Sequence, residues 1–564
     1  MTVHVDAKSI GKEEEHDAYF QQNEEEQKLN VQNDPDQPQT KNEQDEPEYP
    51  GIVKVILIVS SLFITVFLVA LDQTIIGTAI PKITDQFHSV GDVGWYGSAY
   101  FLTSTALQPT YGRIYKILSV KWAFLAAIFV FELGSLMCGV APNSSVLIGG
   151  RAVAGCGTAG IFSGSLIILS YCIPLRQRPM VFGLFSAVWG LASVVGPLLG
   201  GAFTDHVSWR WCFYINLPIG GLAAVVVLAI LHIPQKESPE TPSWKQKMME
   251  LDLIGAALLI PAIVCLLLAL QWGGSKYAWS NSRIIGLFIG FGLIIILFAF
   301  SQWKLGDRAT LPPRILKKRS VWSASIFAVC FGGAFYLLMY YLPIYFQSVK
   351  DHSATKSGID LLPILLASVI SSILLGGVIT IVGYYTPFLL FSTVLFCIGT
   401  GLLTTYSPTI STGKWIGYQI LAGSGIGAGF QVPMTAVQTV LSQDDIPIGS
   451  AIVVFSQSLG GALFISVAQS VFQNGLVSYL DSHSEDIESS VIVGAGATGV
   501  RQVLAQMGKL NELPTVVNAY MNGLGNAYRV SLALTCLAFI VCLFVEWKSV
   551  KKEKGGGLEP SLAV

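Results

Sequence analysis

The chain has 564 residues, of which 52% are hydrophobic and only 12% are charged, with a formal net charge of −2. A soluble protein carries about 25% charged residues, so this composition excludes an ordinary soluble globular protein. The charge is also uneven, because residues 1–50 hold 14 of the 36 acidic residues and 4 of the 34 basic residues. We expect these residues to form a disordered acidic tail. They lack the basic start and apolar core of a signal peptide.

Apolar segments of about 20 residues follow one another along the rest of the chain, and a segment of that length spans a bilayer as a helix. The sequence predicts fourteen of them, at 53–80, 93–111, 121–140, 146–171, 180–203, 211–232, 252–271, 284–302, 321–346, 358–380, 385–405, 414–438, 449–473 and 527–547. The expected fold class is therefore an all-α integral membrane protein. An excess of Lys and Arg in short loops marks the cytoplasmic side. With both termini in the cytoplasm, 23 basic residues fall inside and ten outside.

These segments divide the chain into five expected parts. They are an acidic cytoplasmic tail at 1–50, a six-helix half at 51–232, two inserted helices with a basic cytoplasmic loop at 233–320, a second six-helix half at 321–547 and a cytoplasmic tail at 548–564. An internal similarity supports the two halves, because Arg151-x3-Gly155 has a counterpart in Gln419-x3-Gly423. Transporters built from two repeated halves bind substrate between them, near mid-membrane. We expect 474–526 to form a long outer loop, which can include a short surface helix, because no apolar run there is long enough to span.

Small residues line one face of the segment at 180–203. They recur at spacings of three and four and are Ser186, Gly190, Ser193, Pro197 and Gly201, with Gly196 and Gly200 forming a G-x-x-x-G step beside them. Such a face lets two helix backbones touch, and a proline bends the helix that carries it. The pattern fits either plain tight packing or a surface on which two helices move against each other.

Three charged residues stand out well inside predicted spans, where an unpaired charge is costly; they are Asp72, Glu132 and Arg151. At ~1.5 Å per residue, Asp72 lies ~9 Å and Arg151 ~10 Å to the outer side of the bilayer centre. An acid beside a guanidinium releases its proton readily and binds it again when the partner moves away. The two residues therefore form either a proton switch or a static ion pair that joins two helices.

Glu132 falls near the middle of the third segment, where we expect a peripheral or lipid-facing position. A carboxyl group in that position needs a partner or a function. It either bonds to Ser135 or a neighbouring helix, or it is a second proton site.

Aromatic and amide side chains on several segments are candidates to line a substrate cavity. They are Trp189, Tyr336, Tyr340, Gln431, Gln438 and Gln457. A largely apolar cavity with a few polar groups suits an organic molecule that permeates membranes. For each residue alone, ordinary packing is the alternative.

Several of these residues occur in longer motifs. The run from Leu71-Asp72-Gln73-Thr74-Ile75 to Pro81 resembles the helix-1 signature L-D-x-T-I-V-x-x-A-L-P of the 14-helix drug:proton antiporters in the major facilitator superfamily. The run from Gly190 to Gly201 resembles the fifth-helix antiporter motif of the same superfamily. Arg151 with Gly155 resembles its helix-4 R-x-x-x-G motif.

The resemblance implies the major facilitator fold, with two six-helix halves and two inserted helices. It also implies that Asp72 takes part in proton coupling and Arg151 in proton transfer. One motif departs from the family, because Lys116 stands where the family has an aspartate. The charge relay that closes the inner gate in the family is therefore in doubt, and Arg113, Lys116 and Lys121 then fulfil only the positive-inside rule.

The stretch from Asp445-Ile446-Pro447-Ile448-Gly449 to Gly461 is similar to that of fungal toxin and multidrug efflux pumps. This resemblance implies a proton-coupled exporter of small, largely hydrophobic organic compounds that works by alternating access. The alternative is a 14-helix importer, such as a siderophore-iron:proton symporter. A membrane sensor or membrane-embedded enzyme is a third class, but neither a soluble domain nor a cluster of His, Asp or Cys points to it. No P-loop motif G-x-x-x-x-G-K-[S/T] occurs, so an ion gradient is the expected energy source.

The expected partners are a small-molecule substrate, protons and the lipid bilayer, without nucleic acid, cofactor or metal, and the protein is expected to be a monomer. The nine cysteines form no C-x-x-C pair, which speaks against a metal site or a disulfide framework. The expected location is the plasma membrane, with the vacuolar or a vesicle membrane as the alternative. Asn143 begins a glycosylation sequon, which we expect to be unused because its loop is short.

Overall fold

The computed structural model describes residues 50–551, apart from 89–91, 233–249, 275–276 and 485–486. The acidic tail at 1–49, most of the basic loop before residue 250 and the tail from 552 lie outside the described residues. Within the described part, thirteen helices are long and apolar enough to cross a membrane. This confirms the prediction of an all-α integral membrane protein.

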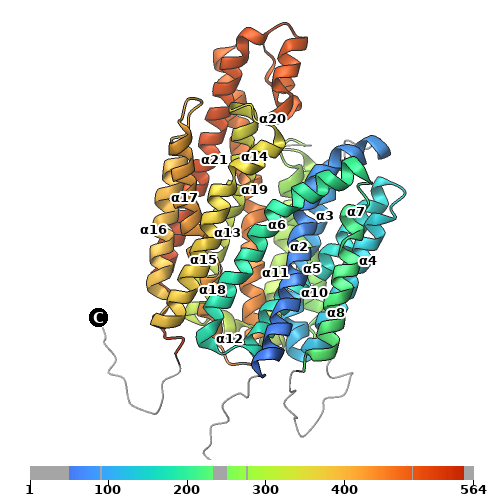
Figure 1. Cartoon of the computed structure of the whole chain (residues 1–564), viewed down its shortest axis with the longest axis vertical. Helices are drawn as coiled ribbons and strands as arrows, with labels where there is room; N and C mark the ends of the chain where they lie inside the picture. The colour runs from blue at the N-terminus through green and yellow to red at the C-terminus, as the bar shows by residue number, and fades with distance from the viewer. Residues whose placement is uncertain (1–49, 89–91, 233–249, 275–276, 485–486, 552–564) are drawn as a thin grey trace, which may run out of the picture. The chain divides into compact units, whose positions relative to one another are not determined.

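The helices run largely side by side along the bundle (Figure 1). In chain order they are α2 (Ile52–Phe87), α3 (Val93–Ile117), α4 (Val120–Gly139), α5 (Ser144–Cys172), η2 (Leu175–Gln177), α6 (Arg178–His206), α7 (Trp211–Tyr214), α8 (Asn216–Ile230), α10 (Leu253–Trp272), α11 (Ser282–Leu305), η3 (Gly306–Arg308), α12 (Pro313–Leu316), α13 (Arg319–Ile344), η4 (Tyr345–Val349), α14 (Ala354–Asp360), α15 (Leu362–Val382), α16 (Thr386–Leu403), α17 (Thr412–Gly429), α18 (Val432–Val440), α19 (Ile446–His483), α20 (Ser489–Gln506), η5 (Leu510–Glu512) and α21 (Leu513–Cys542).

The thirteen membrane-length helices correspond to thirteen of the fourteen predicted spans. The remaining one, α3, is a helix of 25 residues but is not apolar enough to count among them. Its polar residues Ser104, Thr105 and Gln108 are buried in the protein. A helix that faces the protein interior need not be apolar all round, so hydropathy underestimates α3 as a span.

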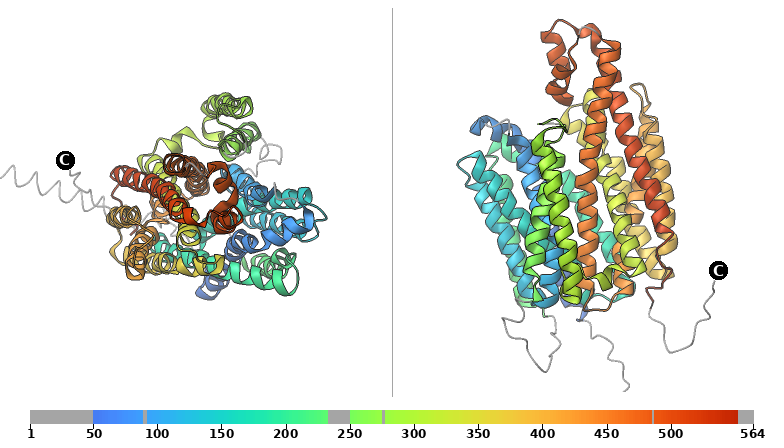
Figure 2. Two further views of the ribbon diagram at one scale, coloured as in Figure 1. Left: turned by 90° about the horizontal axis from the view of Figure 1, so that it is seen from above. Right: turned by 180° about the vertical axis from the view of Figure 1, so that it is seen from behind.

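The predicted long outer loop at 474–526 is helical over most of its length. Helix α19 continues to His483, α20 follows, and α21 begins at Leu513, so the hairpin around α20 extends beyond the other helices (Figures 1 and 2). Leu476 and Leu480 of α19 and Val516 and Leu524 of α21 are buried in one apolar cluster. This contact stabilises both helices where the intervening residues are too polar for a membrane span.

Two large apolar clusters form the interior. One combines α13, α15, α16, α17 and α21. The other combines α2, α4, α5 and α6 and reaches across to α18 and the start of α19. The second cluster therefore joins early and late parts of the chain at one end of the bundle, which we call the base and define by Lys116, Arg178 and Asp445.

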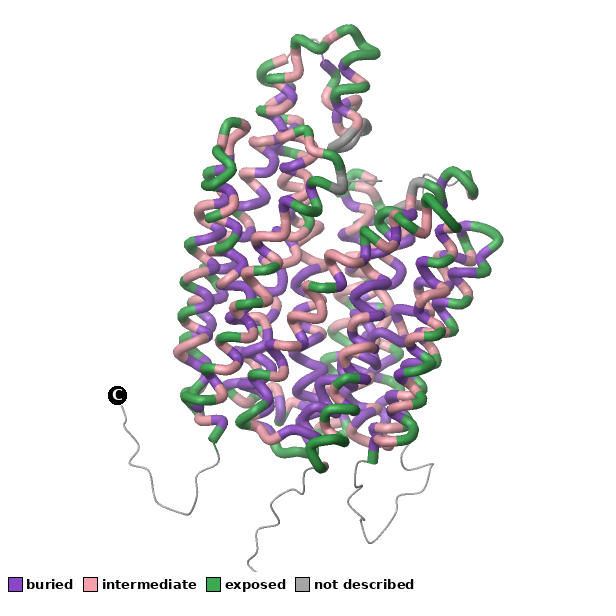
Figure 3. Tube along the Cα trace, viewed as in Figure 1, coloured by how far each residue is buried: buried purple, intermediate pink, exposed green. Residues whose placement is uncertain are grey.

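Helix α6 packs against both α2 and α15, and α3 packs against both α5 and α19. The inserted pair α10 and α11 contacts the bundle mainly through α3 and α19. Early and late helices thus meet along α6–α15 and α3–α19. The burial pattern in Figure 3 follows this arrangement, with buried residues toward the middle of the bundle and at the base.

Candidate substrate cavity and buried ion pair

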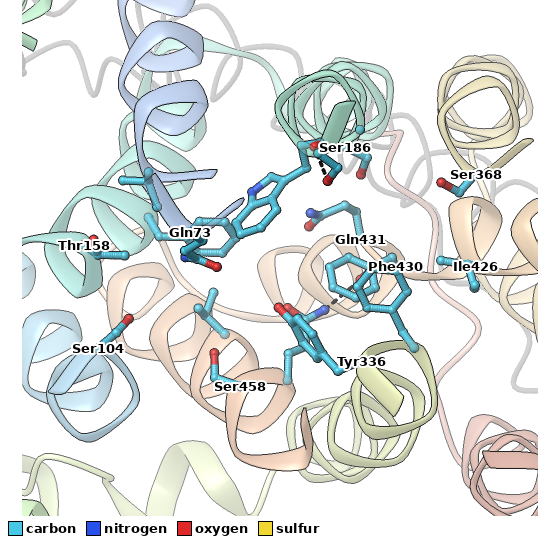
Figure 4. Close-up of a pocket in the computed structure, with 18 of the residues that line it drawn as sticks. Gln73, Ser104, Thr158, Ser186, Tyr336, Ser368, Ile426, Phe430, Gln431 and Ser458 are labelled. Carbon is cyan, nitrogen blue, oxygen red and sulfur yellow. Dashed lines mark hydrogen bonds between the residues drawn. The ribbon is translucent and has the colours of Figure 1, made fainter. Parts of the chain in front are cut away.

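A cavity lies among α2, α3, α5, α6, α13, α15, α17 and α19 (Figure 4). It has a volume of about 1000 Å³, counting open solvent within it. The lining residues are Val69, Gln73, Phe101, Ser104, Thr105, Gln108, Thr158, Phe162, Ser186, Trp189, Gly190, Ser193, Phe335, Tyr336, Leu365, Ser368, Ile426, Gly427, Phe430, Gln431, Val454, Gln457 and Ser458. These are aromatic, amide and hydroxyl side chains with a few apolar ones, and none of them is acidic or basic.

Four of the six predicted substrate residues belong to this lining. Trp189 comes from α6, Tyr336 from α13 and Gln457 from α19, while Gln431 lies between α17 and α18. Gln457 Nε2 donates to the carbonyl oxygen of Phe430 at 2.8 Å, and this bond fixes the amide beside the aromatic rings. The structure thus brings together residues from four parts of the chain.

The other two predicted residues lie elsewhere. Tyr340, one turn beyond Tyr336 on α13, has 56% of its surface exposed and is not part of the lining. Gln438 is at the base, where its Oε1 accepts from Arg178 Nη1 at 3.2 Å and its Nε2 donates to Ser450 Oγ at 3.2 Å. Gln438 therefore joins α18 to α6 and α19, away from the cavity.

Asp72 of α2 and Arg151 of α5 form an ion pair, with Nη1 and Oδ2 2.5 Å apart. Both side chains are buried, at 0% and 1% exposure. Asp72 Oδ1 also accepts from Asn216 Nδ2 at 3.3 Å, and Arg151 Nε donates to the carbonyl oxygen of Tyr96 at 2.8 Å. Both carboxylate oxygens thus have partners, as a buried charge requires.

Tyr100 of α3 connects this ion pair to the cavity. The Arg151 guanidinium carbon lies 4.3 Å from the centre of the Tyr100 ring. At its other end the Tyr100 hydroxyl lies 2.5 Å from Thr158 Oγ1 and within hydrogen-bonding reach of Gln73. Thr158 and Gln73 both line the cavity. One buried side chain therefore separates the cavity from the ion pair.

Sequence reasoning did not identify Tyr100 or Thr158 as site residues. Neither belongs to a motif, and a tyrosine within an apolar segment has no distinguishing local pattern. Asn216 does belong to a recognisable pattern, because it is the first residue of an N-L-P run after α7. Its position beside Asp72 depends on the packing of α2 against α8.

Glu132 of α4 is half-buried and packs against Gly220 of α8. Neither of its carboxylate oxygens has a hydrogen-bond partner among the described residues. Ser135, one turn along, instead accepts from Asn216 Nδ2 at 3.1 Å. The expected bond from Glu132 to Ser135 is therefore not formed. Ser135, one turn from Glu132, instead contacts Asn216, which also donates to Asp72.

The small residues of α6 contact two different helices. A side chain added at Gly196 or Gly200 would meet α2 at Thr74 or at Ile75 and Thr78. One added at Gly190 would meet Val369 of α15, whereas Gly201 faces open space. Pro197 lies within α6, between these contacts. Helix α6 thus touches both α2, next to Asp72, and α15 in the later half of the chain.

Charged groups also meet at the base. Lys116 Nζ lies 2.8 Å from Asp445 Oδ1, and Arg314 Nη1 lies 3.0 Å from Asp445 Oδ2. Burial raises the pKa of the Asp445 carboxyl, but the hydrogen bonds and charges of Lys116 and Arg314 outweigh it and lower that pKa to about 2. Arg113 donates to the carbonyl oxygens of Glu250 and Asp307 at 2.9 and 3.0 Å. Arg113 and Lys116 therefore have specific partners in addition to their charge.

Asn143 caps the start of α5, where its side chain accepts from the Val146 amide at 3.0 Å. The residue is exposed. Its amide oxygen is used in the cap, and the expectation that the sequon is unglycosylated stays a prediction.

Comparisons with known proteins identify the family and support the fold. A family model described as Major Facilitator Superfamily matches residues 62–465. The MFS-type efflux pump MFS1 of Arthroderma benhamiae is 50% identical over 511 residues, which cover 91% of this chain and 94% of that protein. The efflux pump aflT of Aspergillus parasiticus is 46% identical over 503 residues, which cover 89% and 97% of the two chains.

Among solved structures, the proton:xylose symporter XylE bound to 6-bromo-6-deoxy-D-glucose gives a TM-score of 0.57 at 12% identity, covering 88% of this chain and 97% of that chain. The human organic anion transporter MFSD10 gives 0.56 at 14% identity, covering 86% and 99%. At this level of identity the likeness concerns the fold alone.

Proposed function

The chain belongs to the major facilitator superfamily, and on that premise we propose that this multi-pass membrane transporter exports small, largely hydrophobic organic molecules in exchange for protons. The observation that carries the proposal is the buried Asp72–Arg151 pair, which lies one side chain away from an uncharged cavity. Export is the favoured direction because several relatives that match nearly the full chain are named efflux pumps.

The proton acts on Asp72 in this proposal. A protonated Asp72 no longer neutralises Arg151, and an unpaired buried charge is strongly destabilising. Protonation therefore favours a rearrangement in which Arg151 keeps its contacts to Tyr96 and Tyr100 and α2 shifts relative to α5. Substrate and proton then favour different arrangements of the same helices, which is what an exchanger requires.

Helix α6 transmits such a shift. Gly196 packs on Thr74, two residues from Asp72, and Gly190 packs on α15 across the cavity. Because Gly196 and Gly200 carry no side chains, α6 lies close against α2, and a movement of α2 is transmitted directly to α6. The two parts of the bundle then rock around the cavity, which is alternating access.

We assign the base to the cytoplasm, because with that orientation most basic residues fall inside. The proposed location is the plasma membrane, with the vacuolar or a vesicle membrane as the alternative, and the proposed working unit is a monomer. Glu132 is the proposed second proton site, because its carboxylate has no partner among the described residues and lies one turn from Ser135, which contacts the Asp72 partner Asn216.

The test is Asp72→Asn, with Asp481→Asn as its control, since Asp481 is an exposed acid near the C-terminal end of α19. We expect wild-type protein in proteoliposomes to accumulate the uncharged dye Nile red when a pH gradient is applied, and a protonophore to stop it. Asp72→Asn is expected to lose gradient-driven accumulation while Asp481→Asn retains it. Full accumulation by Asp72→Asn would make the carboxylate structural, and dye movement along with protons in the opposite sense would indicate an importer.

A further inference from the structure

We propose that the cavity selects uncharged, flat aromatic molecules that carry a hydrogen-bond acceptor such as a carbonyl group, and that it rejects organic cations. This inference rests on the proposed function, because it names the substrate class of the same cavity. It concerns selectivity within that class and is independent of the direction of transport and of the coupling ion.

The first observation is the absence of any acidic or basic residue among the 23 lining residues. Asp72 directly precedes cavity residue Gln73 in the chain, but it is fully buried and neutralised by Arg151. An organic cation that enters this cavity loses water and gains no counter-charge, which strongly opposes binding. An uncharged molecule does not meet that barrier.

The second observation concerns hydrogen bonds that the protein leaves unmade. The indole Nε1–H of Trp189 is buried and has no acceptor within the described part of the chain. Gln108, whose surface is 3% exposed, likewise has an Oε1 without a donor there. Both residues line the cavity. A buried donor without an acceptor is destabilising, so a carbonyl oxygen on the ligand improves binding by accepting from Trp189.

The third observation is the aromatic character of two parts of the lining. Trp189 and Phe162 form an edge-to-face pair with centroids 6.2 Å apart on α6 and α5. Phe335 forms such pairs with Tyr336 and Phe430, each at 5.1 Å, on α13 and next to α17. Figure 4 shows Tyr336 and Phe430 on one side of the space and Gln73 and Thr158 on the other. Aromatic faces and edges favour a flat ring system between them.

A matched pair of dyes tests the charge selectivity. Nile red and Nile blue share one fused aromatic ring system, but Nile red carries a carbonyl group where Nile blue carries a positively charged nitrogen. We expect cells that express the wild-type protein to export Nile red and to retain Nile blue as untransformed cells do. Equal export of both dyes by the wild type would overturn the inference while leaving the exporter proposal intact.

Two cavity variants extend the test. Trp189→Phe keeps an aromatic ring but removes the N–H, and we expect export of Nile red to fall by about two- to tenfold, the loss of one neutral hydrogen bond. Gln108→Glu places an acid in the cavity and is expected to allow export of Nile blue. The controls are Trp303→Phe on the exposed face of α11 and Gln502→Glu on α20, which make the same exchanges outside the cavity.

Binding separates the inference from the proposed function if no dye is transported. A ligand that binds the folded state raises the unfolding temperature. We expect Nile red to raise it for purified wild-type protein in lipid nanodiscs but not for Trp189→Phe, and Nile blue to raise it only for Gln108→Glu. Stabilisation of the wild type by Nile blue, or equal stabilisation of wild type and Trp189→Phe by Nile red, would contradict the proposed selectivity whether or not the protein is an exporter.

Discussion

At the scale of single residues, Tyr100 connects the two parts of the site, because its hydroxyl contacts the cavity and its ring contacts the ion pair. The hydroxyl lies 2.5 Å from Thr158 Oγ1, and the ring lies under the Arg151 guanidinium at 4.3 Å. A substrate that forms a hydrogen bond to the Thr158 hydroxyl competes with the Tyr100 hydroxyl for that group. We infer that occupancy of the cavity changes the position of the ring and thus the support of Arg151.

Tyr100→Phe tests this connection because it keeps the ring and removes the hydroxyl. We expect the protein to fold, since one buried hydrogen bond is worth about 1 kcal/mol. The number of protons exchanged per transported dye is expected to fall, while dye binding changes little. The measurement is the ratio of proton flux to dye flux in proteoliposomes.

Thr158→Ser is the matched control, since serine keeps a hydroxyl at the same place. It is expected to preserve the ratio of proton flux to dye flux. If Tyr100→Phe and the wild type gave the same ratio, the Tyr100 hydroxyl would have no part in coupling.

The sequence indicated Asp72 and Arg151 because their depths in two spans could be calculated. Charged side chains within a membrane span are stable when they pair with an opposite charge at the same depth. It did not indicate Tyr100, whose role comes from the packing of α3 on α5. Tyr336 and Tyr340 show the same limit. They are one turn apart on α13, yet Tyr336 lines the cavity and Tyr340 is exposed. The sequence could not separate them, because hydropathy does not distinguish a cavity-facing side of a helix from an outward-facing one.

At the scale of elements, neighbouring glycines of α6 have different surroundings, because one contacts α2 and the next has open space beside it. Gly200 packs against Ile75 and Thr78 of α2, whereas its neighbour Gly201 has open space beside it. The sequence placed both residues in one motif, and only the packing distinguishes them. Span positions were predictable for the same helix, because its apolar length is a local property.

This difference predicts opposite effects for neighbouring substitutions. In Gly200→Ala the new methyl group meets the α2 backbone, and overpacking of this kind costs about 1–3 kcal/mol. We expect a lower unfolding temperature and a loss of transport. Gly201→Ala is expected to keep the wild-type unfolding temperature and the wild-type transport, because its methyl group enters open space and alanine favours a helix over glycine by about 1 kcal/mol. If the two variants behaved alike in thermal unfolding and dye export, close contact of α6 with α2 would not be needed.

At the scale of the whole molecule, the base holds early and late helices together below the cavity. Lys116 of α3 meets Asp445 just before α19, and Gln443 Nε2 donates to the carbonyl oxygen of Ser170 at 3.3 Å. Arg314 joins Asp445 to Asp307, so the segment after the inserted pair takes part. The family's usual aspartate is replaced by Lys116, and an acid on the facing element supplies the opposite charge. The structure thus shows a charged contact at a place where the sequence left the family's charge relay in doubt.

The response of this contact to pH follows from the Asp445 carboxyl, whose pKa is lowered to about 2. A lowered pKa means that the contact stabilises the folded state fully above the unfolded-state value of about 3.9 and loses that effect as the pH falls toward 2. Asp445→Asn is therefore expected to lower the unfolding temperature by the same amount at every pH between about 5 and 8. Thermal unfolding of both proteins in detergent across that range measures the difference.

A difference that shrinks as the pH falls from about 8 to 5 would show that Asp445 takes up a proton there and that its contacts to Lys116 and Arg314 are weaker than the structure has them. A constant difference removes Asp445 from the groups that respond to protons in that range. Any pH dependence of transport between these values then arises from other groups, and substitution of Asp72, a buried acid beside the cavity, tests one of them.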